Sequence, residues 1–434
     1  MGLKQLEGGV SADFGKVAPV PTQLDKKSGV RYDFNDGLRI KTAEDDTVWR
    51  LNIYNAETGD LLTSDLMPSN TSMSFPFKYY IPYRFTMEAS NRRLVEHTLS
   101  LRGRTVAFKM CQRTLGDPIA FFSYIPYFVQ KHKCKAVVYA PKRIADIFRT
   151  SYPDIQFAQL EDECETAPYA TYYLGLFFGE DAVNQYHQPY DFRLFGLHEH
   201  SKHILGLDEG LVADAPKCEI HKNKSSKKYV CISYSGSKAN KAWWNPTGWD
   251  CVITYLKQQG YDVYCIDRDR VYGLFPYIIR MPYGVIDATG DLPLQERIDL
   301  IAGADMLICM ASGLAWLGWL ARVPVVLISG FSLPYAEFYT PYRVINPLAG
   351  CIGCWNDTRI RFNRHVFKWC PRIDAKVAEV QAKMSRVTVP EELPIYEEEL
   401  ESLEQQRFMC TKKISGNMVI QVIKQVLRDK KIIK

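Results

Sequence analysis

The chain has 434 residues, of which 47% are apolar and 24% charged, and it carries a formal net charge of +5. This length and composition predict a soluble globular protein of two or three domains. A net charge this small argues against a nucleic-acid-binding face and against a polybasic membrane patch.

The first 26 residues contain no apolar core, so we expect no signal peptide. The most apolar stretch, residues 314–328, contains Arg322 and Pro324 and is too short to span a bilayer. Twelve cysteines without a secretion signal favour a reducing compartment, where thiols bind metals more often than they form disulfides. We therefore expect a cytoplasmic protein without a membrane span.

In chain order, a poorly ordered lead-in over residues 1–28 is expected to precede a small all-β domain over residues 29–100. Apolar and polar residues alternate there between turns, as in Val48–Tyr54, and helical periodicity is absent. This pattern is typical of a small β-barrel or sandwich, and we assign a barrel.

From residue 101 onward, buried strands alternate with helices, which predicts an α/β fold with parallel sheets. The pattern restarts after a polar linker at 207–228, giving two Rossmann-like lobes, over 101–212 and 213–345, with a cleft between them. The strands are expected at 105–110, 136–139, 155–158, 229–234, 263–266, 306–309 and 325–328. The helices are expected at 119–130, 142–148, 246–258, 294–302 and 314–321.

Residues 346–410 are predicted to form an irregular insert with four cysteines, and residues 411–434 to contain a closing helix. The spacing Cys351-x-x-Cys354, then Cys370 and Cys410, is typical of a closed tetrahedral thiolate site, for which zinc is the commonest metal. The alternative is that these cysteines are ordinary small buried side chains. The acidic run at 391–404 is predicted to be a solvated helix.

The chain lacks a Gly-x-Gly-x-x-Gly motif after its first strand and lacks a Walker A sequence, so we expect neither nicotinamide or flavin chemistry nor P-loop hydrolysis. Instead, Thr114-Leu-Gly116-Asp117 follows the first strand of the first lobe. Gly116 permits a close turn, which would project Asp117 into the cleft. The alternative is that Asp117 only caps the next helix, with Pro118 at its first position.

In the second lobe, the loop that follows the first strand combines small hydroxyl side chains with lysines, as anion-binding loops do. Asp267 ends the next strand, where a carboxylate can accept ribose hydroxyls, and Ser312-Gly313 lies where a helix N-terminus can meet a diphosphate. Together these residues predict a sugar-nucleotide site, for which we assign donor contacts to Thr114, Gly116, Ser235, Ser237, Lys241, Asp267, Leu292, Ser312 and Gly313.

His198, His200 and His203 are spaced at i, i+2 and i+5 and do not share one helix face. We therefore predict a solvated or partner-facing helix rather than a metal site.

The order of four motifs resembles the heptosyltransferases of the bilobed type-B fold: the Gly-Asp loop, Lys241-x-Trp243, the segment at 294–305 that ends in Leu-Ile-Ala-Gly-Ala-Asp, and Ser-Gly-Leu from residue 312. With the β unit and the cysteine set added, residues 30–430 resemble the bacterial autotransporter heptosyltransferases. The resemblance implies an N-terminal β-barrel, a two-lobed catalytic domain and a four-cysteine finger that holds one iron. It also implies assembly into dodecamers.

The same resemblance implies transfer of heptose from ADP-D-glycero-β-D-manno-heptose to serine hydroxyls of autotransporter adhesin passenger domains. By this resemblance Asp117 looks like the catalytic base and Lys241 like the cation near the diphosphate. Ser312 and Gly313 look like phosphate contacts and Asp267 like the ribose contact. The iron ligands would be Cys351, Cys354, Cys370 and Cys410.

One departure concerns the sugar. Lipopolysaccharide heptosyltransferases carry an Asp before the Thr-Gly pair and a His shortly after it, and here Ala311 and Trp316 stand in those places. We expect Trp316 to lie at a loop-to-helix entry that faces the cleft. Either other residues bind the donor sugar or the acceptor is not lipopolysaccharide. We expect an inverting transfer without a catalytic divalent metal, since Lys241 and a helix N-terminus can stabilise the leaving ADP and we expect neither lobe to carry an Asp-x-Asp pair in a cleft loop. The alternatives are a nucleotide-sugar epimerase, a bilobed glycosyltransferase with a different donor, and a non-catalytic zinc-ribbon adaptor.

Overall fold

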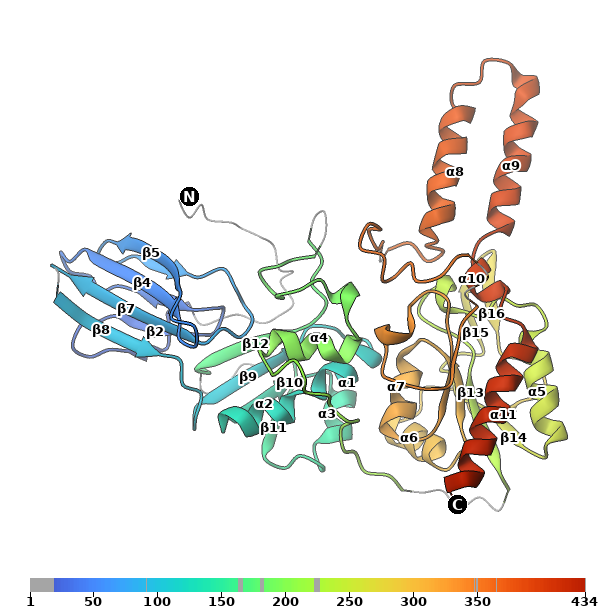
Figure 1. The fold of residues 1–434 in the computed structure, drawn as a ribbon, viewed down its shortest axis with the longest axis horizontal. Helices are drawn as coiled ribbons and strands as arrows, with labels where there is room; N and C mark the ends of the chain where they lie inside the picture. The colour runs from blue at the N-terminus through green and yellow to red at the C-terminus, as the bar shows by residue number, and fades with distance from the viewer. Residues whose placement is uncertain are drawn as a thin grey trace. The chain divides into compact units, whose positions relative to one another are not determined.

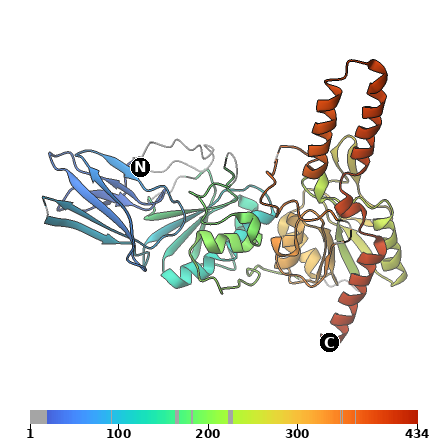
Figure 2. The same cartoon turned by 45° about the horizontal axis from the view of Figure 1, so that its top comes forward.

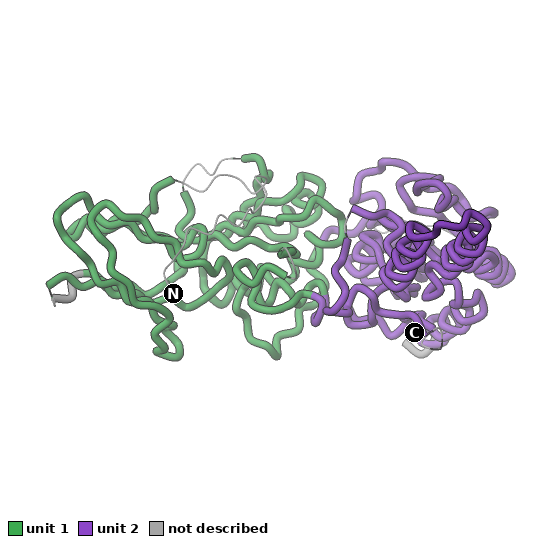
Figure 3. Tube along the Cα trace, turned by 90° about the horizontal axis from the view of Figure 1, so that it is seen from above, with its two compact units in different colours: residues 1–192, 197–217 green, residues 193–196, 218–434 purple. Residues whose placement is uncertain are grey.

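The structure is a computed structural model that describes residues 19–433 except 91, 163–166, 180–182, 222–226, 347, 349 and 364. Its internal contacts divide the chain into two compact units (Figure 3). Unit 1 comprises Met1–Phe192 and Leu197–Lys217, and unit 2 comprises Arg193–Gly196 and Cys218–Lys434.

Unit 1 begins with two four-stranded antiparallel sheets (Figure 1). The first has the order β1-β2-β3-β6, with β1 Gln23–Leu24, β2 Arg31–Asp33, β3 Arg39–Lys41 and β6 Ser72–Ser74. The second has the order β5-β4-β7-β8, with β5 Leu61–Met67, β4 Trp49–Asn55, β7 Tyr83–Ala89 and β8 Arg92–Thr98. In β4 every second side chain, Trp49, Leu51 and Ile53, is buried, as expected for a strand with one face on a core. The region is all-β as predicted, and its closure into a barrel stays a prediction.

The rest of unit 1 is a parallel sheet in the order β11-β10-β9-β12, covered by helices. The strands are β9 Thr105–Met110, β10 Lys135–Tyr139, β11 Ile155–Ala158 and β12 Ala170–Leu174. The helices are α1 Gly116–Phe122, α2 Ile125–His132, α3 Lys142–Phe148 and α4 Leu197–Ile204. The sequence predicted one helix over 119–130, but the structure has two, separated at Ser123–Tyr124.

Unit 2 contains a six-stranded parallel sheet in the order β17-β14-β13-β18-β19-β20. The strands are β13 Tyr229–Ser233, β14 Asp262–Cys265, β17 Ile286–Asp287, β18 Leu307–Met310, β19 Val325–Ile328 and β20 Arg343–Val344. Strands β18 and β19 are apolar throughout because both faces of the sheet are covered, one by α6 Leu294–Ala302 and α7 Gly313–Leu320 and the other by α5 Gly248–Gln258 and α11 Gly416–Ile433 (Figure 1). An antiparallel hairpin of β15 Val271–Leu274 and β16 Tyr277–Arg280 follows β14.

The cysteine-bearing segment is not irregular throughout, so that prediction is wrong for residues 371–384, where no helix was expected. It contains two helices, α8 Pro371–Met384 and α9 Leu393–Gln405, which pack side by side as an antiparallel pair (Figures 1 and 2). Pro371 stands in the first turn of α8, where its missing N–H is not needed. A short helix, α10 Met409–Lys412, carries the last cysteine. The predicted acidic helix corresponds to α9, whose side chains are mostly exposed.

Across the described part of the chain, no helix has both the length and the apolar content needed to cross a membrane.

Candidate active site

Asp117 lies in the first turn of α1, at the carboxyl end of β9 in unit 1. The N-cap residue of α1 is Leu115, so the prediction that Asp117 might only cap this helix is wrong. The Thr114 hydroxyl donates a 2.7 Å hydrogen bond to Oδ2 of Asp117 and orients the carboxylate. Gly116 is buried at the turn, while Asp117 is partly exposed. A partly exposed, oriented carboxylate at a strand end can accept a proton from a bound hydroxyl.

Asp267 lies two residues beyond the end of β14, is 1% exposed and is turned toward the loop that follows β13. Its carboxylate accepts hydrogen bonds from the Ser233 hydroxyl, from the Tyr234 and Ser235 N–H groups and from the Ser235 hydroxyl, at 2.5–3.2 Å. Burial raises the pKa of Asp267, and these four hydrogen bonds act against that rise. The observed role of Asp267 is therefore to fix the loop, and its predicted ribose contact stays a prediction.

Asp267-Arg268-Asp269 is an Asp-x-Asp sequence in the loop after β14, so the expectation that neither lobe carries such a pair there needs correction. Asp269 is exposed and its side chain lies 3.9 Å from that of Arg268, whereas the Asp267 carboxylate is buried against the 233–235 loop. The two carboxylates thus have different surroundings and different partners.

The loop after β13 brings two ammonium groups together around a short 3-10 turn, η2 Ala239–Lys241. The Lys238 ammonium donates to the Val366 carbonyl at 2.9 Å, and burial, followed by the charge of Lys241, lowers its pKa. The Lys241 ammonium lies 5.7 Å from the centre of the Phe331 ring. A Cβ at position 236 would come within 2.6 Å of the Lys241 Cβ, so this close approach requires Gly236.

Two polar side chains in the loops after β13 and β18 have buried atoms without hydrogen-bond partners within the described residues. Asn240 is 4% exposed, and neither its amide nitrogen nor its amide oxygen has a partner within the described residues. The Ser312 hydroxyl, at the N-cap of α7, is likewise buried without a partner there. An unsatisfied buried polar atom costs free energy, so each marks a place where a polar ligand would gain a partner. Sequence reasoning found Ser312 from its position but missed Asn240, since an amide in a loop carries no spacing signal.

The predicted donor residues of unit 2 lie at one edge of its sheet. Asp267 follows β14, the loop of Ser235, Ser237 and Lys241 follows β13, and Ser312-Gly313 follows β18, and these three strands are neighbours. Leu292 is 39% exposed in the loop before α6. Thr114, Gly116 and Asp117 belong to unit 1 and form the corresponding edge of its sheet. The carboxyl ends of parallel strands are where open α/β sheets bind ligands.

The four predicted metal ligands influence one another's ionisation. A hydrogen bond with Cys354 lowers the pKa of Cys351 to about 6. Burial raises the pKa of Cys410 to about 12, and Cys351 and Cys370 add to that rise. All four cysteines are free thiols, which suits a soft metal. Within the described ranges, however, no three His, Cys, Asp or Glu side chains are arranged to hold a metal, so the metal site stays a prediction.

Comparison with known proteins gives the chain a family. The profile "Glycosyltransferase TibC, N-terminal domain" matches residues 27–90, and "Glycosyltransferase family 9 (heptosyltransferase)" matches residues 193–344. Autotransporter heptosyltransferase TibC of Escherichia coli O78:H11 is 40% identical over 81% of this chain and 85% of its own length. The chain belongs to the autotransporter heptosyltransferase family.

Two further comparisons refine this membership. The crystal structure of dodecameric iron-containing heptosyltransferase TibC in complex with ADP-D-beta-D-heptose matches with a TM-score of 0.82 and 35% identity, covering 95% of this chain and 99% of that one. The chain thus has the α/β glycosyltransferase fold of TibC. A relative named inactive autotransporter heptosyltransferase BimC, from Burkholderia thailandensis, is 31% identical over 83% of both chains. The sequence-based assignment to autotransporter heptosyltransferases, and so to glycosyltransferases, is confirmed.

Two sequence-based expectations need correction. Two of the three α4 histidines are not solvated, because His200 is fully buried with its Nε2 2.9 Å from the Gly175 carbonyl oxygen and His198 is also buried, whereas His203 is partly exposed. Trp316 does not face a cleft, because it is buried against Trp319 and Phe338. In both cases an apolar environment supplied by distant segments, invisible in local periodicity, buries the ring.

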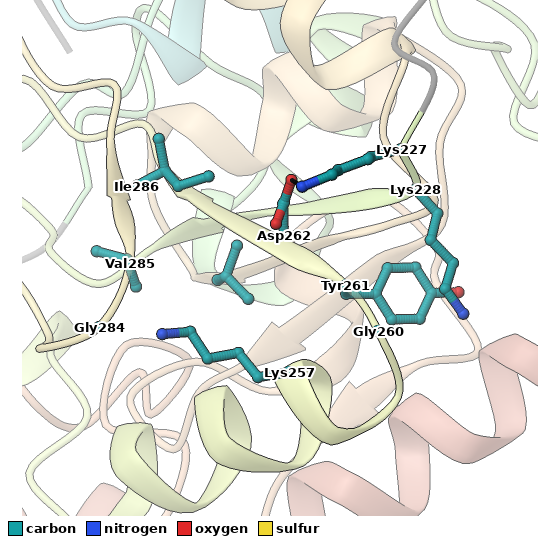
Figure 4. A pocket seen from close by; sticks show the side chains of 10 residues that line it. Lys227, Lys228, Lys257, Gly260, Tyr261, Asp262, Gly284, Val285 and Ile286 are labelled. Carbon is teal, nitrogen blue, oxygen red and sulfur yellow. Dashed lines mark ion pairs between the residues drawn. The ribbon is translucent and has the colours of Figure 1, made fainter.

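An open depression of about 830 Å³ lies elsewhere on unit 2 (Figure 4). Its lining includes Lys228, just before β13, Asp262 at the start of β14, and Lys257 of α5. These residues lie at the amino ends of the strands, so the depression is at the edge of the sheet opposite to the donor loops. It is not part of the candidate active site.

Proposed function

We propose that this protein transfers heptose from ADP-D-glycero-β-D-manno-heptose to serine hydroxyls of an autotransporter adhesin, with inversion at the anomeric carbon. Membership of the family supports the reaction class, and the ADP-heptose bound in the TibC crystal structure supports the donor. The names of the relatives support an autotransporter as the acceptor, and the adhesin and its serine hydroxyls are part of the proposal.

The observation that carries the donor assignment is the row of groups at the ends of β14, β13 and β18. Lys241 and the N-terminus of α7 provide positive charge, and the atoms of Ser312 and Asn240 that have no partner within the described residues provide hydrogen-bonding capacity in the same loops. A diphosphate needs both.

In the proposed reaction, Asp117 accepts the proton of the serine hydroxyl as its oxygen attacks the anomeric carbon. The bond between that carbon and the diphosphate oxygen breaks, and ADP leaves with the bonding electron pair. Lys241 and the α7 N-terminus stabilise the negative charge that grows on the leaving ADP. Groups of this chain can therefore balance that charge by themselves. The Thr114 hydroxyl keeps the carboxylate oriented.

We also propose that Cys351, Cys354, Cys370 and Cys410 hold one iron and that the protein assembles into a dodecamer. The support is the iron-containing dodecameric TibC structure and the mutual influence of the four thiols. Bound there, the metal would tie chain segments together and would take no part in transfer.

Measuring ADP release from ADP-heptose, with and without a candidate adhesin passenger domain, tests this function. A transferase releases ADP only when the acceptor is present, apart from slow hydrolysis. A nucleotide-sugar epimerase would alter the sugar nucleotide without releasing ADP, and a non-catalytic adaptor would do neither. Either of these outcomes contradicts the proposal.

A further inference from the structure

In this chain neither Ala311 nor Trp316 can hold a donor sugar through a polar side chain. Ala311 has none, and the Trp316 ring is buried between Trp319 and Phe338 at centroid distances of 5.3 and 5.0 Å. If the chain uses a sugar nucleotide, another group near the donor loops must contact the sugar.

Four aromatic rings form a cluster beside Lys238 and Lys241, the two lysines of the loop after β13. Phe331 follows β19, and Trp355, Phe362 and Trp369 come from the segment between Cys354 and Cys370. Successive ring centroids are 5.0–5.9 Å apart, mostly in edge-to-face geometry. Phe331 and Trp369 are buried, whereas Trp355 and Phe362 are partly exposed. Trp355 and Phe362 are therefore the partly exposed members of a cluster whose other two rings are buried.

Hydrogen bonds at both ends attach this segment to the loops at the carboxyl edge of the unit 2 sheet, where we propose that the donor binds. At one end, Gly353 N–H donates to Gly330 O at 2.8 Å and Trp355 N–H to Phe331 O at 3.0 Å. At the other, Lys238 Nζ donates to Val366 O and Ala239 N–H to Phe367 O at 3.1 Å. The segment thus joins the loops after β19 and β13, the strands on either side of β18, which are roughly 10 Å apart at about 4.8 Å per strand.

The strand order also indicates in which direction the bound donor would extend along the edge of the sheet. With the proposed ribose contact after β14 and the diphosphate at the ends of β13 and β18, the sugar would extend toward β19. The aromatic cluster lies on that side, since the Lys241 ammonium is 5.7 Å from the Phe331 ring centre and that of Lys238 is 5.9 Å from the Phe362 ring centre.

We propose that Trp355 and Phe362 form the surface against which the donor's heptose packs, and that they determine which ADP-sugar is used. The C–H face of a pyranose is apolar, and a rigid aromatic ring can cover it with little loss of side-chain entropy. This inference rests on the proposed function and assigns the sugar subsite to the cysteine-bearing segment.

Titration calorimetry with ADP and with ADP-heptose tests the proposal on the full-length protein. Trp355→Ala and Phe362→Ala should each weaken ADP-heptose binding about tenfold while leaving ADP binding within about twofold. Trp355→Phe, which keeps a ring, should recover most of the affinity. Tyr339→Ala is the matched control, since this side chain is 86% exposed in the same unit and outside the cluster.

The same variants should also lose part of their preference for ADP-heptose over ADP-glucose. Unchanged ADP-heptose affinity in both alanine variants would overturn the inference, as would an equal loss for ADP and ADP-heptose in folded protein. If the wild-type protein does not bind ADP-heptose at all, the proposed function fails first, and this result is distinct from the other two. Phe362→Ala and Trp355→Phe keep the test valid if Trp355→Ala does not fold.

Discussion

Asp117 and Lys241 both follow the first strand of a parallel sheet, yet their surroundings suit them to opposite tasks. The Asp117 carboxylate is partly exposed and oriented by Thr114, as a proton acceptor requires. The Lys241 stem packs on Gly236, which leaves its ammonium beside an aromatic ring and a second lysine, as an anion site requires.

Replacing Asp117 with Asn should lower the rate of transfer roughly 10²–10⁴-fold, because an amide cannot accept the proton. Donor affinity should stay near that of the wild-type protein. Rates measured with saturating donor and acceptor check this. Asp146→Asn is the control, since Asp146 is a surface carboxylate of α3 paired with Lys142. A D117N variant with more than about a tenth of wild-type turnover would rule out this base.

Replacing Lys241 with Ala should weaken donor binding by roughly 10- to 100-fold, the value of a lost hydrogen bond to a charged group. The KM for ADP-heptose reports this change. Lys257→Ala, at the opposite edge of the same sheet, should have no effect. Equal KM values for both variants would remove Lys241 from the donor site.

At the scale of elements, local periodicity predicted most strands of the two parallel sheets but missed β12, β17 and β20. Strands such as Val325–Ile328 and Thr105–Met110 are short apolar runs bounded by turns, and their type follows from that alone. Local periodicity did not predict α8, because this helix directly follows a segment rich in cysteine and glycine, which is typical of irregular structure. Asn240 and the buried α4 histidines could not be found, because their environment is created by residues distant in sequence.

The α4 helix should make stability depend on pH. Burial lowers the pKa of His200 to about 4 from its ordinary 6.5, with smaller effects from Gly175, His203 and Asp191. The unfolded chain therefore binds a proton between pH 6.5 and 4 that the folded chain does not, so stability falls as the pH falls through this range. His200 should account for about 3 kcal/mol of that loss. Thermal unfolding of the wild-type protein and of the His200→Gln variant, measured from pH 7 to 4, compares how their stabilities depend on pH. An equal loss of stability in both proteins would refute the role of His200.

At the scale of the whole molecule, the cysteine-bearing segment and the β unit are additions to a two-lobed enzyme. Cys410 packs directly on Gly330, next to the loop that carries Phe331, so the cysteine segment supports the donor lobe. The profile match at 27–90 places the β unit among domains shared with TibC.

Elemental analysis of purified protein should find close to one metal per chain, with iron expected and zinc possible after heterologous expression. Replacing Cys351 and Cys354 with Ser should remove the metal and destabilise the finger or the assembly before the Rossmann-like lobes. Cys251→Ser, an exposed thiol of α5, is the control. A metal-free wild-type protein of normal stability would contradict the metal site.

Deleting residues 1–90 should reduce protein glycosylation far more than ADP-heptose binding, because we expect the β unit to hold the acceptor or order the assembly. Glycosylation assays and calorimetry on the truncated protein provide the comparison. Equal losses would mean that the β unit only supports the fold.

The central claim is transfer to a protein acceptor, and the intact mass of that acceptor tests it most directly. A candidate adhesin passenger domain incubated with ADP-heptose and this protein should gain mass in steps of one heptosyl residue. The steps should disappear with the D117N variant, and Ser→Ala changes at the modified positions should prevent them. An unchanged passenger mass, together with efficient heptosylation of lipopolysaccharide core, would contradict the account.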